Sequence, residues 1–273
     1  MCGRSRAMIL RRITQAFRRQ DWFTVFVETM IVVLGVFLGL QVNNWNEDRA
    51  DRVRASAYLE RIRGDLHTDV VTYGDRVAFW SDVSGYGATA LTYADTGETR
   101  GASQWELLLA FFQASQLGEF FTRDTTYEEL KSAGELHLIS NVALRDELAN
   151  YYTTADNPAL SERPLYREHI RGLIPFDIQL YIWENCYRTV LNEKQEMLAC
   201  DSPINEGRTT EILEELRASK KLIEELRFWM STMHVAGIMG RDRTRSATRI
   251  LDLIDAQPGR GVKVQQIKEA PKP

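Results

Sequence analysis

An apolar run of twenty-one residues that begins at Trp22 and contains one charge, Glu28, constrains this chain more than any other feature. As a helix rising ~1.5 Å per residue it would reach ~31 Å, close to the thickness of the hydrocarbon core of a bilayer. Trp22 and Trp45 flank the run, where amphipathic rings prefer the headgroup layer. We therefore predict one transmembrane helix over residues 22–45.

Two other structures share an apolar run near the N-terminus. A buried core helix of a soluble protein would have a similar composition, but it does not require aromatic residues at both ends and arginines before it. A cleaved signal peptide would need small residues at its cleavage site, whereas Gln41-Val-Asn-Asn-Trp-Asn-Glu47 follows the apolar core. A retained membrane span is therefore the expected structure.

The residues before the run are strongly basic. Residues 1–21 carry six arginines and one acid, a net charge of +5. Because the whole chain has a net charge of −4, the remaining residues carry −9. This basic amphipathic segment is expected either as a short helix in the membrane interface or as a flexible tail that acts as a topology signal. Five arginines follow in residues 46–65. The small excess of arginines before the span favours a cytoplasmic N-terminus and a large periplasmic domain.

Small and polar residues share one side of the predicted span. At about 100° per residue, Glu28, Gly35, Gly39 and Asn43 fall within about 80° of one another. The G-x-x-x-G pair permits close approach of two helix backbones, and Glu28 and Asn43 could form hydrogen bonds across such a contact. The alternatives are a Glu28 that reaches water and a chance pair of glycines. A packing face here predicts self-association or a partner helix within the lipid bilayer.

The helical pattern continues beyond the span, which predicts a helical extramembrane domain over residues 46–257. Apolar residues recur at helical spacing to about residue 95, and a second stripe at 4-3 spacing predicts one helix over 210–256. The fold class expected is all-α, a transmembrane helix followed by an elongated antiparallel helical bundle. Residues 258–273 are expected to form a disordered tail. The second stripe consists of Ile212, Leu216, Ser219, Ile223, Leu226, Met230, Met233, Gly237, Gly240, Thr244, Ala247, Leu251 and Ile254.

Shorter helices are expected between these two long ones. A capping box at Thr125 and Glu128 predicts a helix over 126–133, which Gly134 ends. Asn141 is expected to cap a helix that reaches residue 152. The pattern over 163–190 is again helical, but Gly172 and Pro175 are expected to break or kink it. Residues 196–208 are expected as a loop.

Two segments resemble known sequences. The stretch from Phe17 to Leu66, with Val-Leu-Gly-Val-Phe-Leu-Gly-Leu-Gln-Val-Asn-Asn-Trp-Asn-Glu inside it, resembles the N-terminus of uncharacterised bacterial single-pass membrane proteins. The segment Thr126-Tyr-Glu-Glu-Leu-Lys-Ser-Ala-Gly-Glu-Leu-His-Leu-Ile-Ser-Asn is similar to their second signature. The group carries a domain of unknown function, so the resemblance implies a bacterial inner-membrane protein and brings no site residues.

The sequence contains no recognisable catalytic, metal-binding or phosphate-binding motif. The four histidines are scattered, and the chain has no H-E-x-x-H, C-x-x-C, phosphate-binding glycine loop or nucleophile elbow. No catalytic residue, cofactor or metal is therefore expected. The acidic balance after residue 21 argues against nucleic acid as a partner.

Cys186 and Cys200 could close a disulfide loop of fourteen residues if the domain lies outside the cytoplasm. The alternative is two unrelated buried thiols. Three functions follow from these observations: a membrane-anchored interaction or scaffold protein, such as an accessory subunit of a membrane complex; an extracytoplasmic ligand-sensing bundle that acts through a partner; and an enzyme, which the lack of motifs disfavours.

Overall fold

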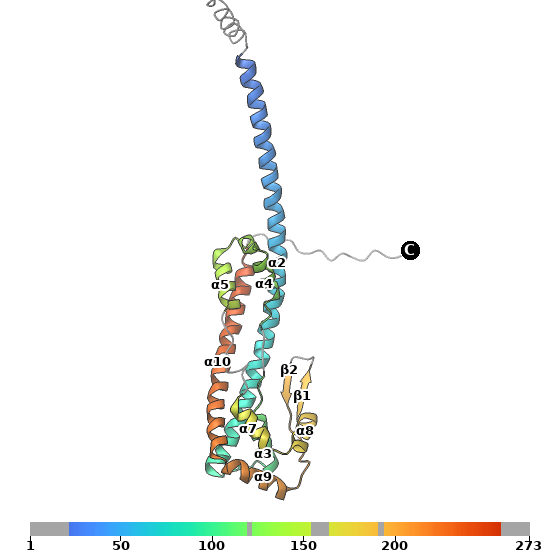
Figure 1. Cartoon of the computed structure of the whole chain (residues 1–273), viewed down its shortest axis with the longest axis vertical. Coiled ribbons are helices and arrows are strands. Elements are labelled where there is room, and N and C mark those ends of the chain that lie inside the picture. Colours follow the sequence, from blue (N-terminus) through green and yellow to red (C-terminus); the bar gives the residue numbers. More distant parts are fainter. Residues whose placement is uncertain (1–21, 119–121, 154–163, 191–193, 258–273) are drawn as a thin grey trace, which may run out of the picture. The chain divides into compact units, whose positions relative to one another are not determined.

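The computed structural model describes residues 22–118, 122–153, 164–190 and 194–257. The predicted basic segment 1–21 and the predicted tail 258–273 lie outside these residues. The described chain is mostly helical and divides into two compact units, Met1–Ala57 and Tyr58–Pro273. Helix α2 (Trp22–Thr96) contributes to both units (Figure 1).

In the first unit, α2 is an apolar helix whose side chains are exposed throughout residues 26–50. Its most apolar 18-residue window has a mean hydropathy of 2.2, and none of that window is buried. By length and composition this helix can cross a membrane. The prediction of a long helix that ends near residue 95 is confirmed, because α2 ends at Thr96.

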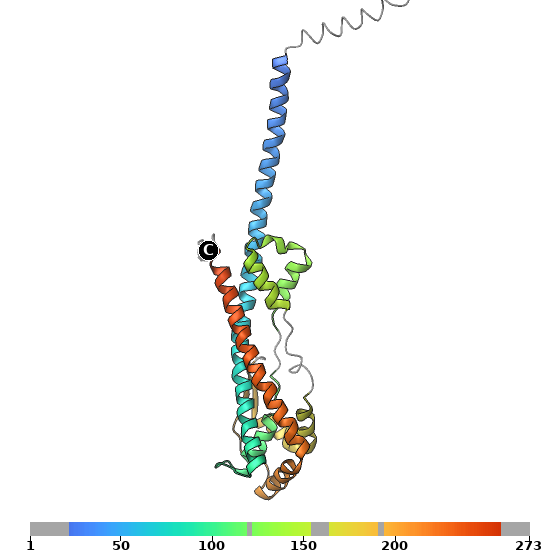
Figure 2. The ribbon, with the colours of Figure 1, turned by 90° about the vertical axis from the view of Figure 1, so that its left-hand side faces the viewer.

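In the second unit, the part of α2 after Tyr58 packs against helix α10 (Lys220–Asp255), and the two lie side by side in both views (Figures 1 and 2). The Arg63 Nε donates a hydrogen bond to Asp255 Oδ1 at 3.0 Å, and Arg227 forms an ion pair with Asp95. These two contacts join opposite ends of α10 to α2.

One helix over 210–256 was predicted, and this is wrong at Ser219. Helix α9 (Glu206–Ala218) ends there, and α10 begins at the next residue. Ser219 has φ −79° and ψ 88°, and its side chain accepts a hydrogen bond from the Leu222 amide. Serine competes for backbone donors in this way, so a position that fits the 4-3 stripe serves as an N-cap instead.

Helix α3 (Gln104–Gln113) was not predicted, although the sequence carries its start signal. The Ser103 amide donates to Glu106 Oε2 at 2.7 Å, and the Glu106 amide donates to Ser103 Oγ at 3.2 Å. This is a complete capping box ahead of an apolar run.

The predicted capping box at Thr125 is wrong. Helix α4 (Thr125–Ser132) has Asp124 at its N-cap, with no side-chain hydrogen bond to the cap. Gly134 follows α4 with φ 71°, a conformation that favours glycine, and precedes the 3₁₀ helix η1 (Glu135–Leu138).

The next two predictions are confirmed. Helix α5 (Val142–Thr153) is capped by Asn141, whose Oδ1 accepts from the Leu144 amide at 3.2 Å. Helices α7 (Leu165–Leu173) and α8 (Phe176–Asn185) are separated at Pro175. The helix does not end at Gly172, which lies within α7.

A small antiparallel hairpin corrects the all-α prediction, the end of the helical pattern expected over 163–190 and the start of the loop expected over 196–208. Strands β1 (Tyr187–Val190) and β2 (Lys194–Met197) pair Tyr187 with Met197 and Arg188 with Glu196. Four-residue strands show too few alternations to produce a clear period-2 signal in sequence.

Two apolar clusters form the core of the second unit. One joins α3, α7, α8 and α9 to residues 79–93 of α2. The other joins α4 and α5 to Leu59–Leu66 of α2 and to the last turns of α10. The hairpin and the segment after α3 lie beside the first cluster.

Candidate functional site

The four residues predicted as a membrane packing face are all exposed on α2. Among the described residues, a Cβ added at Gly35 or Gly39 would meet no atom within 4 Å outside the backbone of its own helix, so both positions are open to an approaching helix. The Asn43 Nδ2 donates to Glu47 Oε1 at 2.8 Å, within the same helix. Glu28 is exposed on the same helix.

Cys186 and Cys200 are joined by a disulfide, with their Cα atoms 5.3 Å apart. Cys186 is the C-cap of α8 and is fully buried, and the bridge encloses the β1–β2 hairpin. The carbonyl of Cys186 accepts from Gln113 Nε2 at 2.9 Å, and that of Cys200 accepts from Trp105 Nε1 at 2.9 Å. Both ends of the disulfide are thereby tied to α3.

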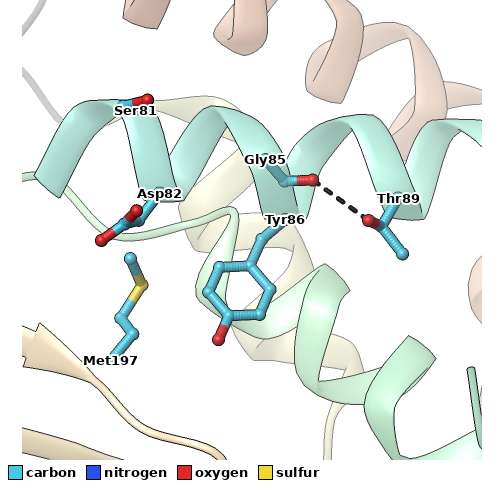
Figure 3. Close-up of a pocket in the computed structure, with 6 residues that line it drawn as sticks. All are labelled: Ser81, Asp82, Gly85, Tyr86, Thr89 and Met197. Carbon is cyan, nitrogen blue, oxygen red and sulfur yellow. Dashed lines mark hydrogen bonds between the residues drawn. The ribbon is translucent and has the colours of Figure 1, made fainter. Parts of the chain in front are cut away.

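A pocket of about 440 Å³ lies between α2 and β2. Figure 3 shows the Met197 side chain from β2 next to Asp82, and the Tyr86 ring projecting from α2. Burial raises the pKa of Tyr86, and the Asp82 charge adds to this, so its hydroxyl stays protonated. The lining offers a carboxylate and hydroxyl groups for hydrogen bonding. It consists of Ser81, Asp82, Gly85, Tyr86, Thr89 and Met197.

Arginines of α2 and α7 form hydrogen bonds to the hairpin and to the segment after α3. Arg76 of α2 is 8% exposed and donates to Gln195 Oε1 of β2 at 2.8 Å. Arg167 of α7 donates to the Ser115 carbonyl at 2.6 Å. Burial raises the pKa of Tyr187; a hydrogen bond to Thr189 and the charges of these two arginines and of Arg171 oppose that rise. Each of the three guanidinium charges therefore acts to lower the pKa of Tyr187.

Arg171 of α7 is the most firmly held of the three arginines. Its guanidinium carbon lies 4.9 Å from the ring centroids of both Phe112 and Trp183. Its Nε donates to Ser115 Oγ and its Nη2 donates to Gln116 Oε1, each at 3.2 Å. Stacking and two hydrogen bonds fix the plane of this side chain.

The surroundings of Arg171 disfavour its positive charge. Burial and then the neighbouring Arg167 charge lower its pKa to about 9. Within the described residues, its hydrogen bonds go to neutral acceptors rather than to carboxylates. We call Arg76, Arg167, Arg171 and Tyr187 the arginine cluster.

Two of the histidines, His137 and His169, have ordinary partners. The His137 Nδ1 lies 3.1 Å from the Gly134 carbonyl, and the His169 Nδ1 lies 2.9 Å from Glu225 Oε2. In the part of the chain that the structure describes, no group of three or more His, Cys, Asp or Glu side chains is arranged to hold a metal ion.

No protein-family model, curated protein or solved structure matches this chain. The arginine cluster is the feature that sequence reasoning missed. Arg167 and Arg171 are one helical turn apart, which could have suggested a basic face on α7. Nothing in the sequence placed Arg76 or the hairpin beside that face.

Proposed function

We propose that this chain is a membrane-anchored helical interaction protein without catalytic activity, which associates with itself or with a partner through its transmembrane helix. In this proposal α2 crosses a bacterial inner membrane once, with the N-terminus in the cytoplasm and the second unit in the periplasm. The observation that carries the proposal is the open stripe at Gly35 and Gly39, where an added Cβ would meet no atom of the described residues within 4 Å, apart from the backbone of its own helix.

Helix association in a membrane depends on close packing and hydrogen bonds, since lipid tails are as apolar as leucine. A stripe with two glycines, a carboxyl group at Glu28 and an amide at Asn43 supplies both. An exposed carboxylate in a span is costly in lipid, and a partner helix would relieve this cost. The stripe therefore supports a contact between two helices within the membrane rather than a role as an inert anchor.

The periplasmic placement is supported by the Cys186–Cys200 disulfide. Disulfides persist in oxidising compartments and are rare in the cytosol. The excess of arginines in residues 1–21 points the same way. The resemblance to bacterial single-pass proteins agrees with this placement and remains a prediction.

We also propose that the second unit is an antiparallel helical bundle. Contacts between α2 and α10 occur in opposite chain order, because Arg63 meets Asp255 while Asp95 meets Arg227. Such a rod-like unit would suit a scaffold or accessory subunit of a membrane complex.

The test is crosslinking of the tagged chain in its native membrane, followed by mass spectrometry of the purified product. Replacement of Gly35 and Gly39 by Ile should abolish the crosslinked species, because the added side chains prevent close helix approach. Leu34→Ile with Phe37→Ile is the matched control, since both residues lie on the other side of the helix. Unchanged crosslinking in the glycine variant would contradict the proposed packing face.

A second candidate function is an extracytoplasmic ligand-sensing unit that acts through a partner. It is favoured by the 440 Å³ pocket between α2 and β2. In that case a small molecule would bind the second unit, and the glycine variant would still bind it.

A further inference from the structure

We propose that the pocket between α2 and β2 binds a small organic amine in its protonated form, with the ammonium group at the Asp82 carboxylate and the carbon chain against Tyr86 and Met197. This inference rests on the second candidate function, ligand sensing, and names the chemical class of the ligand. Three observations support it: the free space at Gly85, the charge of the pocket and the hydrogen-bonding groups that line it.

The pocket has the size of a ligand site. Its volume of about 440 Å³ falls within the range of about 300–1,000 Å³ that is usual for small-molecule pockets. Gly85 shows the free space independently, because a Cβ built there would meet no atom of the described residues within 4 Å outside the backbone of its own helix. Ser81, Gly85 and Thr89 follow one another at helical spacing, so they lie in one row along α2. The missing side chain in the middle of this row leaves room for a ligand.

The second observation is the charge of the pocket. Asp82 is the only carboxylate among the described residues that line it, and no lysine, arginine or histidine is among them. Within the described ranges, the Asp82 side chain forms no hydrogen bond or ion pair. A hydrogen bond between two charged groups is roughly twice as strong as one between neutral groups, so this carboxylate favours a cationic ligand.

The third observation is that the lining offers hydrogen-bond acceptors and no side-chain N–H donor. Its polar side-chain groups are the Asp82 carboxylate and three hydroxyl groups. The Thr89 hydroxyl already donates to the Gly85 carbonyl at 3.1 Å, so its oxygen is left to accept (Figure 3). An ammonium group presents three donors and no acceptor, which matches this lining. An anionic ligand would instead face the Asp82 charge.

The carbon part of the ligand would contact Tyr86 and Met197. Both side chains are half-buried, whereas the other lining residues are exposed. The Tyr86 ring projects from α2, and Met197 approaches from β2 (Figure 3). A tyrosine ring attracts a cation over its face, and a methionine side chain adapts its shape to an apolar group. The pocket therefore combines a carboxylate with an apolar wall, as a molecule with one ammonium group and one carbon chain requires.

The test is isothermal titration calorimetry on the full chain in a neutral detergent at low ionic strength. The probe is n-butylammonium chloride, and n-butanol has the same carbon chain without the charge. Titration of sodium chloride to the same ionic strength controls for general screening. We expect one saturable site per chain for butylammonium, and binding of butanol that is weaker by about tenfold or more.

Asp82→Asn should weaken butylammonium binding about tenfold or more, because it removes the charge with which the ammonium group pairs. Asp75→Asn is the matched control. Asp75 lies two turns earlier on nearly the same side of α2 but does not line the pocket, so this variant should bind as the native chain does. Circular dichroism checks that each variant is folded.

A second pair of variants changes the space in the pocket and leaves its charge unaltered. Gly85→Leu places a side chain in the free space and should abolish binding. Gly74→Leu is its control, because Gly74 is also an exposed glycine of α2 with no described atom within 4 Å of an added Cβ outside the backbone of its own helix, and it does not line the pocket. Both changes raise helix propensity, so a difference between them reports on the pocket.

Absence of a saturable butylammonium signal in the native chain would overturn the proposal, and this outcome does not depend on the folding of any variant. Equal binding by folded Asp82→Asn and Asp75→Asn would overturn it as well. Equal binding of butanol and butylammonium, lost in Gly85→Leu, would overturn the amine as the ligand while ligand sensing by this pocket survived. The Gly35→Ile, Gly39→Ile variant should bind butylammonium normally, so failure of the membrane contact is also distinguishable.

Discussion

Gly240 of α10 lies directly against Trp80 of α2. A Cβ at position 240 would be 3.0 Å from Trp80 Cζ3 and 2.7 Å from Val77 Cγ2, both closer than side chains normally approach. A small residue within an apolar stripe permits either a close helix approach or a large residue opposite. Trp80 is that large residue.

We predict that Gly240→Ala lowers the free energy of unfolding by about 1–3 kcal/mol, because the added methyl overpacks the contact with Trp80. Gly237→Ala is the control, since a Cβ there meets only the end of the flexible Arg241 side chain, at 3.4 Å. It should be neutral or stabilising by up to about 1 kcal/mol through helix propensity. Urea unfolding of both variants measures the difference, and equal effects would contradict the packing argument.

Removal of the disulfide should destabilise the second unit. Cys186 and Cys200 have a sequence separation of 14, so the replacement of both by Ser should cost about 3 kcal/mol on the chain-entropy model. Urea unfolding with and without reductant measures this: the native chain should respond to reductant, and the double variant should not. Free thiols in protein isolated without reductant would count against both the bridge and a periplasmic location.

Loss of the hydroxyl group should affect stability differently at two neighbouring tyrosines. The Tyr151 hydroxyl donates to Asp69 Oδ2 at 2.8 Å, so Tyr151→Phe should cost about 1–3 kcal/mol by leaving a buried acceptor with fewer donors. The Tyr152 hydroxyl is buried and has no hydrogen-bond partner among the described residues, so Tyr152→Phe should be neutral or stabilising. Thermal unfolding compares the two variants, and greater destabilisation by Tyr152→Phe would refute this account.

Asp69 should make stability depend on pH. It is 1% exposed, and burial raises its pKa above 3.8, although hydrogen bonds from Tyr151 and the Arg123 amide oppose the rise. The folded chain therefore holds this proton more tightly than the unfolded chain does. The contribution of Asp69 to stability is greatest below pH 3.8, falls as the pH rises towards the folded pKa, and is constant above it.

Replacement of Asp69 by Asn removes this titration. The free energy of unfolding of the native chain minus that of Asp69→Asn should therefore decrease as pH rises through the same window. Urea unfolding at a series of pH values measures it. A difference that increases with pH would mean that hydrogen bonding to the carboxylate outweighs its burial.

Features that depend on neighbours along the chain could be predicted. The extent of α2, the cap at Asn141 and the break at Pro175 each follow from residues within a few positions. The capping box at Ser103 was equally local and was overlooked. Ser219 fits the apolar stripe by spacing, but its hydroxyl accepts a hydrogen bond from the Leu222 amide. The stripe is therefore divided between two helices, α9 and α10.

The sequence by itself determined an apolar segment long enough to cross a membrane and a mostly helical chain, because length, hydropathy and helical period are local properties. The tertiary structure alone decided that Trp80 faces Gly240 and that the hairpin brings Gln195 to Arg76. Such meetings depend on how separate elements pack, and no spacing along the chain specifies which side chains from α2, α10 and β2 lie in contact.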